Sequence, residues 1–266
     1  MKKLFLISAF ALFAYNSYAA EQVPPLPVAQ CAAQVPYGMP SVPSDTSTIC
    51  RKAYLLNHDG NAKIAVWTAH TLTAKNAMGC LPREDAFAAD QSLQKGKRAE
   101  LADYLRSGYD QGHMVSNADL SWDRQAANES FYLSNMSPQL PGLNRGIWKL
   151  LETATRSHAY VNNTSVTVYA GNMWYPTSKT IGPNKVIVPD YLFKILIDNN
   201  TKKTYAFLFP NKEGLGNDLG KFQSTVADIE KATGLTFPVP DAKNVKNAIP
   251  AFDYKKITDD KKVVCK

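Results

Sequence analysis

Four segments rich in β-branched and aromatic side chains follow one another in the second half of the chain. They are Ser165–Ala170, Lys185–Val188, Leu192–Ile197 and Thr204–Phe209. Side chains of these kinds favour β-strands, so we predict successive strands of an antiparallel sheet. Strands and helices do not alternate regularly along the chain, which argues against a doubly wound parallel sheet. The expected fold class is therefore α+β, with a central antiparallel sheet flanked by helices.

The first half of the chain adds further predicted strands and one short helix. The turn His58-Asp59-Gly60-Asn61 separates two strand-like segments, which predicts a hairpin. The hairpin strands are Tyr54–Asn57 and Lys63–Thr73. A short helix is expected over Gly96–Arg106, and a short strand over Phe131–Leu133 that leads into a loop from Asn135 to Pro141.

Two longer helices are predicted from apolar spacing and end signals. The first runs from Asn144, as its N-cap, to about Tyr160. Its buried stripe would consist of Ile147, Leu150, Leu151 and Ala154. The second is expected over Leu219–Thr233, ended by Gly234 and Pro238.

The N-terminus predicts export. Lys2 and Lys3 precede the apolar run Leu4–Ala14, and a small-x-small site ends at Ala19, so residues 1–19 are expected to be a cleaved signal peptide. The apolar run is shorter than the roughly 20 residues of a membrane span, so we expect no membrane association. The mature protein would be periplasmic or secreted. Residues 20–45 hold six prolines and are expected to form an extended arm, before one domain over residues 46–266.

Charge and cysteine content limit the partners and the redox environment. The formal net charge is +7 at pH 7, which favours a polyanionic partner. An even number of cysteines in an exported chain favours disulfides over a metal site. Three pairings are possible, and we favour Cys31 with Cys50 and Cys80 with Cys265.

One stretch carries residues suited to the cleavage of a phosphodiester. Asp110-Gln111-Gly112-His113 precedes the helix that carries Asn144, Glu152 and Arg156. A neutral imidazole can take a proton from water, and Asp110 would fix its tautomer or brace the loop. Mg²⁺ prefers oxygen ligands, keeps most of its waters and needs only one or two protein groups, so the amide oxygen of Asn144 suits it.

Helix geometry assigns different roles to Asn144 and Glu152. Glu152 lies eight residues after Asn144, a rise of about 12 Å, which is too far for both side chains to bind one ion directly. We therefore expect Glu152 to hold a water of the hydrated ion. Arg156, one turn further on, would pair with Glu152 or contact a phosphate.

The motifs resemble those of the DNA/RNA non-specific endonucleases. That family has Asp-Arg-Gly-His, then Leu-Ser-Asn-x-x-Pro-Gln, then Leu-Asn-x-Gly-x-Trp-x-x-Leu-Glu. The corresponding segments here begin at Asp110, Leu133 and Leu143, and similarity extends over about residues 50–240. The resemblance implies a ββα-metal nuclease fold and DNA and RNA as substrates.

The resemblance also implies a role for each matching residue. His113 would be the general base, and Asn144 the single direct ligand of a hydrated Mg²⁺, with Mn²⁺ or another divalent cation as a substitute. Asn135 would support the site, and Arg156 would contact phosphate. The remaining substrate-binding positions would be Arg83, Gln111 and Arg145. Gln111 stands where the family has arginine, which removes one positive charge beside the histidine.

Each of these residues also has an ordinary structural explanation. Taken alone, a histidine such as His113 is most often structural, and an asparagine such as Asn144 is most often an N-cap. Glu152 and Arg156, four residues apart on a helix, would normally form a solvated ion pair. Their joint occurrence in this order favours a metal-dependent endonuclease with little sequence preference. The alternatives are an enzyme restricted to one nucleic acid, or a catalytically weak nucleic-acid-binding protein for uptake or adhesion.

Two lysine-rich segments and the assembly state stay open. The segments contain Lys95, Lys97 and Arg98, and Lys255, Lys256, Lys261 and Lys262. By default they form solvated surface, although either could guide a polyanion. The sequence does not determine the oligomeric state, and a homodimer is compatible with it.

Overall fold

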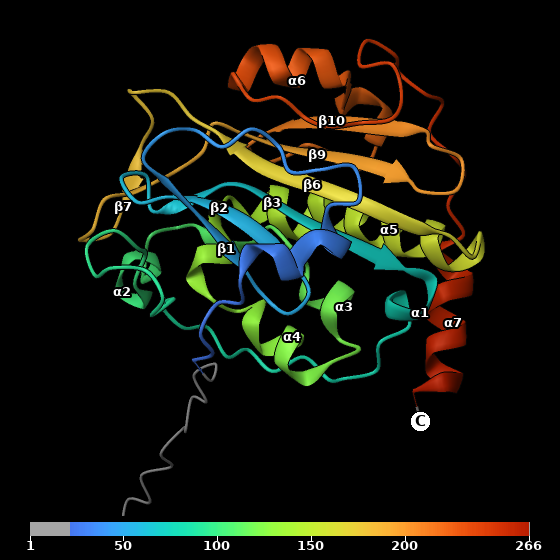
Figure 1. Cartoon of the computed structure of the whole chain (residues 1–266), viewed down its shortest axis with the longest axis horizontal. Helices are drawn as coiled ribbons and strands as arrows, with labels where there is room; N and C mark the ends of the chain where they lie inside the picture. The colour runs from blue at the N-terminus through green and yellow to red at the C-terminus, as the bar shows by residue number, and fades with distance from the viewer. Residues whose placement is uncertain (1–21, 266) are drawn as a thin grey trace, which may run out of the picture.

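The computed structural model describes residues 22–265 (Figure 1). The predicted signal peptide, residues 1–19, lies outside the described residues. Within the described range no helix is long and apolar enough to cross a membrane.

A seven-stranded sheet in which all neighbouring strands are antiparallel forms the centre of the molecule. In spatial order its strands are β1 (Thr46–Cys50), β2 (Leu55–Asp59), β3 (Ile64–Thr73), β6 (Ser165–Met173), β9 (Tyr191–Asp198), β10 (Thr204–Pro210) and β11 (Gln223–Ser224). This confirms the α+β fold class, the hairpin in the first half and three of the four strands predicted in the second half.

The remaining predicted strand, Lys185–Val188, is placed differently. Only Val186–Ile187 (β8) is a strand, and it pairs with β7 (Thr180–Ile181) in a separate two-stranded sheet. The backbone at Lys185 has a φ of 56°, a turn conformation that prevents the strand from starting there. The prediction that Lys185–Val188 belongs to the main sheet was therefore wrong.

Helices cover both faces of the main sheet (Figure 1). On β9, Leu192 and Leu196 face the core beneath helix α5 (Lys149–Val161), whereas Phe193 and Ile195 belong to the core on the other face. That opposite core includes residues of α6 (Val226–Thr233) and of the 3-10 helix η1 (Val28–Gln34). The alternation is the period of two expected for a strand buried on both sides.

A second small sheet lies beside the N-terminal end of α5. Its strands are β4 (Asp110–His113) and β5 (Met136–Gln139), and they pair antiparallel. The chain then enters the π-helical segment η3 (Leu143–Trp148), which continues into α5. Two strands followed by a helix constitute the ββα arrangement that the resemblance implied.

This region differs from the sequence prediction in two ways. Phe131–Leu133 is not a strand; Leu133–Asn135 is a 3-10 turn (η2), and much of the predicted loop that follows is β5. The predicted helix beginning at Asn144 is interrupted at Gly146, where φ is −98° and ψ is −115°, so regular α-helix begins at Lys149. Leu150 is half-buried, whereas Ile147, Leu151 and Ala154 are buried as predicted.

Two other predicted helices are shorter than expected. In place of Gly96–Arg106 there is only α2 (Leu101–Tyr104), because the chain turns at Arg106 with a φ of 56°. In place of Leu219–Thr233 there are η4 (Leu219–Phe222), β11 and α6, because Gln223–Ser224 pairs with β10. Gly234 ends α6 in the left-handed conformation, as predicted.

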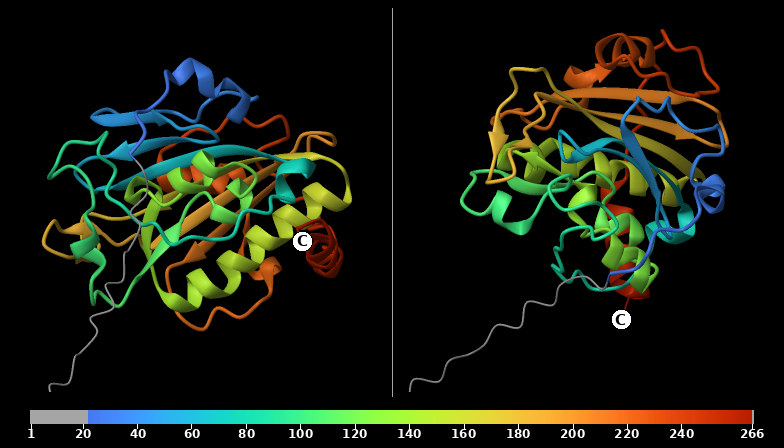
Figure 2. Two further views of the ribbon diagram at one scale, coloured as in Figure 1. Left: turned by 90° about the horizontal axis from the view of Figure 1, so that it is seen from below. Right: turned by 60° about the vertical axis from the view of Figure 1, so that its left-hand side comes forward.

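The remaining helices lie at the edges of these layers. They are α1 (Ala74–Ala77), α3 (Asn117–Leu120), α4 (Arg124–Glu129) and α7 (Tyr254–Val264). Figure 2 shows α7, in red, next to α5.

Two disulfides join distant parts of the chain, and both match the favoured pairing. Cys31 bonds to Cys50 and Cys80 bonds to Cys265. The first bridge fixes η1 against β1, so the proline-rich segment is not wholly extended as predicted. Its stretch between Pro27 and Pro36 contains no proline and forms η1.

Candidate active site

An open groove of about 830 Å³ lies along α5, between β4 and the C-terminal helix α7. Seven of the nine predicted site residues line it, namely Arg83, Gln111, His113, Asn144, Arg145, Glu152 and Arg156. Asp110 and Asn135 are not among its lining residues. Residues far apart in the sequence therefore meet in one concave site, as a catalytic centre requires.

His113 ends β4 and is almost fully buried. Its ring lies against Phe131 and Phe87, with centroid distances of 5.1 and 5.8 Å, and its backbone oxygen accepts a hydrogen bond from Trp148. Its Nε2 has no hydrogen-bond partner among the described residues. Burial, and then the charge of Arg83, lower the pKa of His113 to about 3, so the imidazole is neutral at ordinary pH.

Gly112 lets the two strands of the small sheet lie close together. A Cβ atom at this position would be 2.3 Å from the side chain of Gln139, which packs against the backbone there. Glycine is therefore required before His113 because the neighbouring strand occupies the space.

Asn144 lies in η3 and is oriented by Asp110. Its Nδ2 donates to Asp110 Oδ2 at 2.8 Å, and Arg145 donates to both carboxylate oxygens of Asp110. Burial raises the pKa of Asp110, but the hydrogen bonds from Arg145 and Asn144 outweigh this effect and the pKa lies below its usual value. Asn144 thus does not cap the helix, and that prediction was wrong. Of the two roles predicted for Asp110, the described residues show no hydrogen bond to His113, whereas the bonds to Asn144 and Arg145 brace η3.

Glu152 is paired with a lysine from the central sheet. Lys194 Nζ lies 3.2 Å from Glu152 Oε1 and 4.1 Å from the centre of the Trp148 ring. Both charged side chains are buried. The expected pairing of Glu152 with Arg156 does not occur, because each has a closer partner on another element.

Arg156 lines the groove and forms a buried ion pair. Its Nη1 lies 2.7 Å from Asp119 Oδ1, and Asp119 also binds His70 at 3.0 Å. Burial raises the pKa of Asp119, but the charge of Arg156 and the hydrogen bond from His70 lower it to about 2. Asp119 therefore stays ionised and holds the Arg156 guanidinium fixed at the groove wall.

Asn135 is buried outside the groove lining and forms hydrogen bonds with the backbone. Its Nδ2 donates to the backbone oxygens of Val115 and Ser130, and its Oδ1 accepts from Val115 N. The side chain thus ties the start of β5 to the residues after His113. This placement agrees with a supporting role.

Arg83 and Gln111 lie at the groove opening. Arg83 is half-exposed, pairs with Asp85 at 2.7 Å, and places its guanidinium 5.2 Å from the Phe131 ring centre. Gln111 lies in β4 opposite Pro138. Neither side chain is locked in a buried network, so both can contact a substrate that enters the groove.

Three functional neighbours were not predicted from the sequence: His70, Asp119 and Lys194. Lys194 had a recognisable signal, because it interrupts the apolar run Tyr191–Ile197 at a position that alternation assigns to the core. His70 and Asp119 had no such signal, since neither lies in the quoted motifs.

The groove suits a cation that keeps most of its waters. Among residues 22–265 no group of three or more His, Cys, Asp or Glu side chains could form an all-protein metal site. Asn144 Oδ1 receives no hydrogen bond from the described residues and remains available as a single oxygen ligand. Glu152, on the same wall, offers a carboxylate to a coordinated water. One or two such groups are what Mg²⁺ needs.

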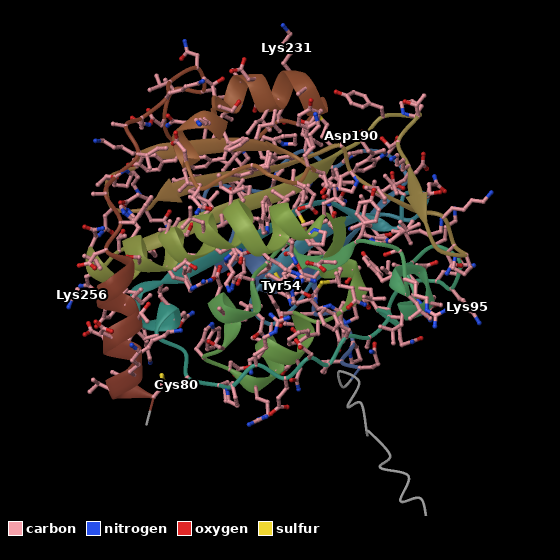
Figure 3. The ribbon with its side chains drawn as sticks, turned by 180° about the vertical axis from the view of Figure 1, so that it is seen from behind. Tyr54, Cys80, Lys95, Asp190, Lys231 and Lys256 are labelled. Atoms are coloured by element: carbon pink, nitrogen blue, oxygen red, sulfur yellow. A yellow bond between two sulfur atoms is a disulfide. The ribbon has the colours of Figure 1, made fainter. Side chains whose placement is uncertain are left out.

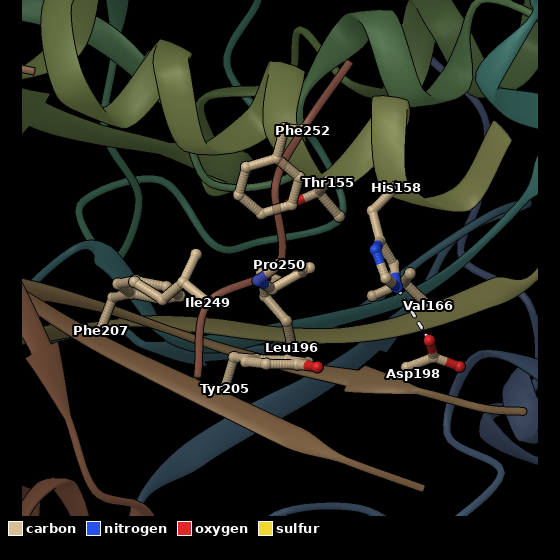
Figure 4. Close-up of a pocket in the computed structure, with 10 residues that line it drawn as sticks. All are labelled: Thr155, His158, Val166, Leu196, Asp198, Tyr205, Phe207, Ile249, Pro250 and Phe252. Carbon is tan, nitrogen blue, oxygen red and sulfur yellow. Dashed lines mark hydrogen bonds and ion pairs between the residues drawn. The ribbon is translucent and has the colours of Figure 1, made fainter. Parts of the chain in front are cut away.

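A second pocket is too small to hold a nucleotide (Figure 4). It has a volume of about 20 Å³, room for one water. His158 and Asp198, 2.8 Å apart, lie at one end and Phe252 at another, and none of its lining residues belongs to the large groove. The large groove is therefore the candidate active site.

Comparisons with known proteins agree with this geometry. The sequence model of the DNA/RNA non-specific endonucleases matches residues 33–243. Human mitochondrial endonuclease G is 32% identical over 220 residues, which cover 76% of this chain and 71% of that protein. Nuclease C1 of Cunninghamella echinulata var. echinulata is 33% identical over 204 residues, which cover 70% of this chain and 81% of that protein.

The fold is also similar to that of a solved nuclease. A chain from a crystal structure of the EndoG/EndoGI complex has a TM-score of 0.73 and 26% sequence identity, covering 82% of this chain and 95% of that chain. With the family match over residues 33–243, these likenesses show that the chain belongs to the DNA/RNA non-specific endonuclease family, whose members are metal-dependent nucleases.

Proposed function

We propose that the protein is an exported, Mg²⁺-dependent endonuclease that hydrolyses phosphodiester bonds in DNA and RNA with little sequence preference. The observation that carries this proposal is that the side chains of His113, Asn144 and Arg156 line one groove, although they are far apart in the sequence. A base, an oxygen ligand and a fixed positive charge are what metal-assisted hydrolysis of a phosphodiester uses.

His113 starts the reaction. Its imidazole ring takes a proton from a water molecule as that water attacks phosphorus. Arg156, held by Asp119, offsets the negative charge that builds on the phosphoryl oxygens. Because Asp119 and His70 fix the guanidinium beforehand, little reorganisation is needed when that charge develops.

Asn144 would be the direct ligand of Mg²⁺, and Glu152 would hold one of its waters. When bound, the ion stabilises charge on the phosphate and on the leaving oxygen. Asp110 turns the amide nitrogen of Asn144 away and leaves the oxygen for the ion. Lys194 holds the Glu152 carboxylate in place.

The groove explains tolerance for both nucleic acids. Its cationic lining residues, Arg83, Arg145, Lys149, Arg156, Lys261 and Lys262, suit phosphates, which DNA and RNA share. Sequence is read at base edges, so contacts made chiefly to phosphate give little sequence preference. Gln111 contributes a neutral contact where the family has arginine.

The two disulfides support export, because such bonds persist in oxidising compartments. With the predicted signal peptide, they favour the periplasm or the medium.

The test is cleavage of plasmid DNA and of RNA by the purified mature protein, with Mg²⁺, with Mn²⁺ and with a chelator. We expect both substrates to be cut with either metal and to survive the chelator. His113→Ala should abolish cleavage, with a melting temperature close to that of the unaltered protein.

Other outcomes would favour a different function or a different base. Intact substrates with Mg²⁺ but a retained gel shift would show a nucleic-acid-binding protein without nuclease activity. Cleavage of one nucleic acid alone would show a restricted enzyme. A His113→Ala variant that cuts at the unaltered rate would exclude His113 as the base.

A further inference from the structure

The C-terminal helix α7 forms a wall of the groove, although it lies beyond residues 33–243 that match the family. It is docked firmly on α5. Ile257 is buried in the core beneath α5, Tyr160 Oη donates to Asp260 at 2.8 Å, and Ser157 Oγ donates to the Asp253 backbone at 2.8 Å. The helix thus lies beside the candidate active site and outside the segment that matches the family.

A disulfide holds the far end of α7 in place. Cys265, directly after the helix, bonds to Cys80, 185 residues earlier in the sequence. Cys80 lies three positions before Arg83, and both cysteines line the groove with His113. Figure 3 shows Cys80 at the free end of α7. The bond therefore joins the two sides of the groove entrance.

The cationic residues of the groove differ in whether they have a carboxylate partner. Four of the six are paired, as Arg83–Asp85, Arg145–Asp110, Arg156–Asp119 and Lys262–Asp259. Lys149 and Lys261 have no carboxylate within ion-pair distance among residues 22–265. These two positive charges remain available for a substrate phosphate.

Lys261 lies close to the proposed catalytic centre. Burial, and then the neighbouring charge of Arg156, lower the pKa of Lys261. Asp119 opposes this effect without reversing it, because it is already paired with Arg156 and His70. An ammonium group held beside another cation is stabilised when a phosphate binds both.

The spacing of these charges suits a nucleic-acid strand. Lys149 and Arg156 lie seven residues apart on α5, a rise of about 10 Å, or about three nucleotides at roughly 3.4 Å per step. Lys261, on α7, lines the same groove and is near enough to Arg156 for the two charges to interact.

We infer that α7 is a phosphate-binding wall: Lys261 contacts a backbone phosphate beyond the cleaved bond, and the Cys80–Cys265 disulfide holds α7 in position for that contact. The inference rests on the proposed active site at His113. It means that a helix outside the segment that matches the family contributes to substrate binding.

The first test compares Lys261→Gln with Lys231→Gln. Lys231 lies on α6, at the opposite end of the molecule from Cys80 (Figure 3). With a 30-base-pair duplex, we expect Lys261→Gln to raise KM about tenfold and to change kcat less than about twofold, since the lost contact serves binding. Lys231→Gln should match the unaltered protein in both constants.

Binding measured without cleavage separates this inference from the proposed function. In a His113→Ala background, duplex affinity is titrated against salt. Lys261→Gln should lower the slope of log affinity against log salt by about 1, the value for one lost phosphate contact. Equal slopes and KM values for Lys261→Gln and Lys231→Gln would overturn the inference while leaving the nuclease assignment intact.

The disulfide is tested by the double variant Cys80→Ser with Cys265→Ser. We expect it to raise KM as Lys261→Gln does, and adding Lys261→Gln to it should cause little further change, because both act through one contact. Circular dichroism at the assay temperature verifies that the variant is folded. Fully additive effects, or an unchanged KM, would show that the bond does not position Lys261.

Discussion

Lys194 is a buried charge whose only polar contact within the described chain is Glu152. Replacing it with methionine keeps the apolar contact with Trp148 but leaves the Glu152 carboxylate buried without a partner. Supporting contacts of this kind commonly change metal affinity or activity by about 10–100-fold. We expect Lys194→Met to lower activity within that range and to raise the Mg²⁺ concentration for half-maximal rate.

Titration of initial rate against Mg²⁺ checks this prediction. Lys212→Met, at an exposed position outside the groove, is the control. If the two variants titrate alike, Lys194 does not position Glu152.

Asp119 links the active site to stability in acid. Its pKa is lowered to about 2 in the folded protein from the usual 3.8, so its stabilising effect is present above pH 3.8 and is lost as pH falls through 2. Asp119→Asn should lower the free energy of unfolding by about 3 kcal/mol at pH 7, because Arg156 loses its partner.

The difference in melting temperature between the two proteins should shrink as pH falls from 7 toward 2. Thermal unfolding followed by circular dichroism at several pH values measures this difference. A constant difference across that range would mean that Asp119 is not ionised at neutral pH.

At the scale of elements, the β4–β5 pair positions His113, the proposed base, through close contact between the Gly112 backbone and the Gln139 side chain. Gly112→Ala would force a Cβ atom into Gln139, and overpacking of this kind costs about 1–3 kcal/mol. We expect Gly112→Ala to lower the melting temperature and the cleavage rate. Adding Gln139→Ala should restore part of both, because it removes the clashing side chain.

Contact between Gly112 and the Gln139 side chain requires this partial rescue in the double variant. If Gln139→Ala worsens Gly112→Ala instead, the Gln139 side chain does not lie against Gly112.

Some elements followed from local pattern and others did not. β6, β9 and β10 are rich in β-branched and aromatic residues, and this composition alone predicted them. The break at Gly146 and the short strand β11 depend on partners elsewhere in the chain. Asp110 binds η3 at Asn144, and β11 exists only by pairing with β10. Propensity summed along a window does not include such partners.

At the scale of the whole molecule, the two disulfides should respond differently to a reductant. Cys31 and Cys50 are buried within the core, whereas Cys80 and Cys265 are exposed. Thiol exchange requires access of the attacking thiolate. Under native conditions, mild dithiothreitol should therefore reduce the Cys80–Cys265 bond first.

Alkylation followed by peptide mass spectrometry measures the order. We expect label at Cys80 and Cys265 while the protein is folded, and label at Cys31 and Cys50 only after denaturant is added. Equal labelling of all four cysteines in the folded protein would contradict the buried location of the first bridge.

The sequence by itself determined the strand-rich centre, the helix after the Asp110–His113 motif and the residue types of the proposed site. These features depend on local composition and on neighbouring residues. The tertiary structure alone decided which charge pairs with which. Glu152 pairs with Lys194, Arg156 with Asp119, and Asp110 with Asn144 and Arg145, across separations of 42, 37, 34 and 35 residues. Such pairs depend on sheet register and helix placement, because a buried charge takes the partner that packing brings within reach.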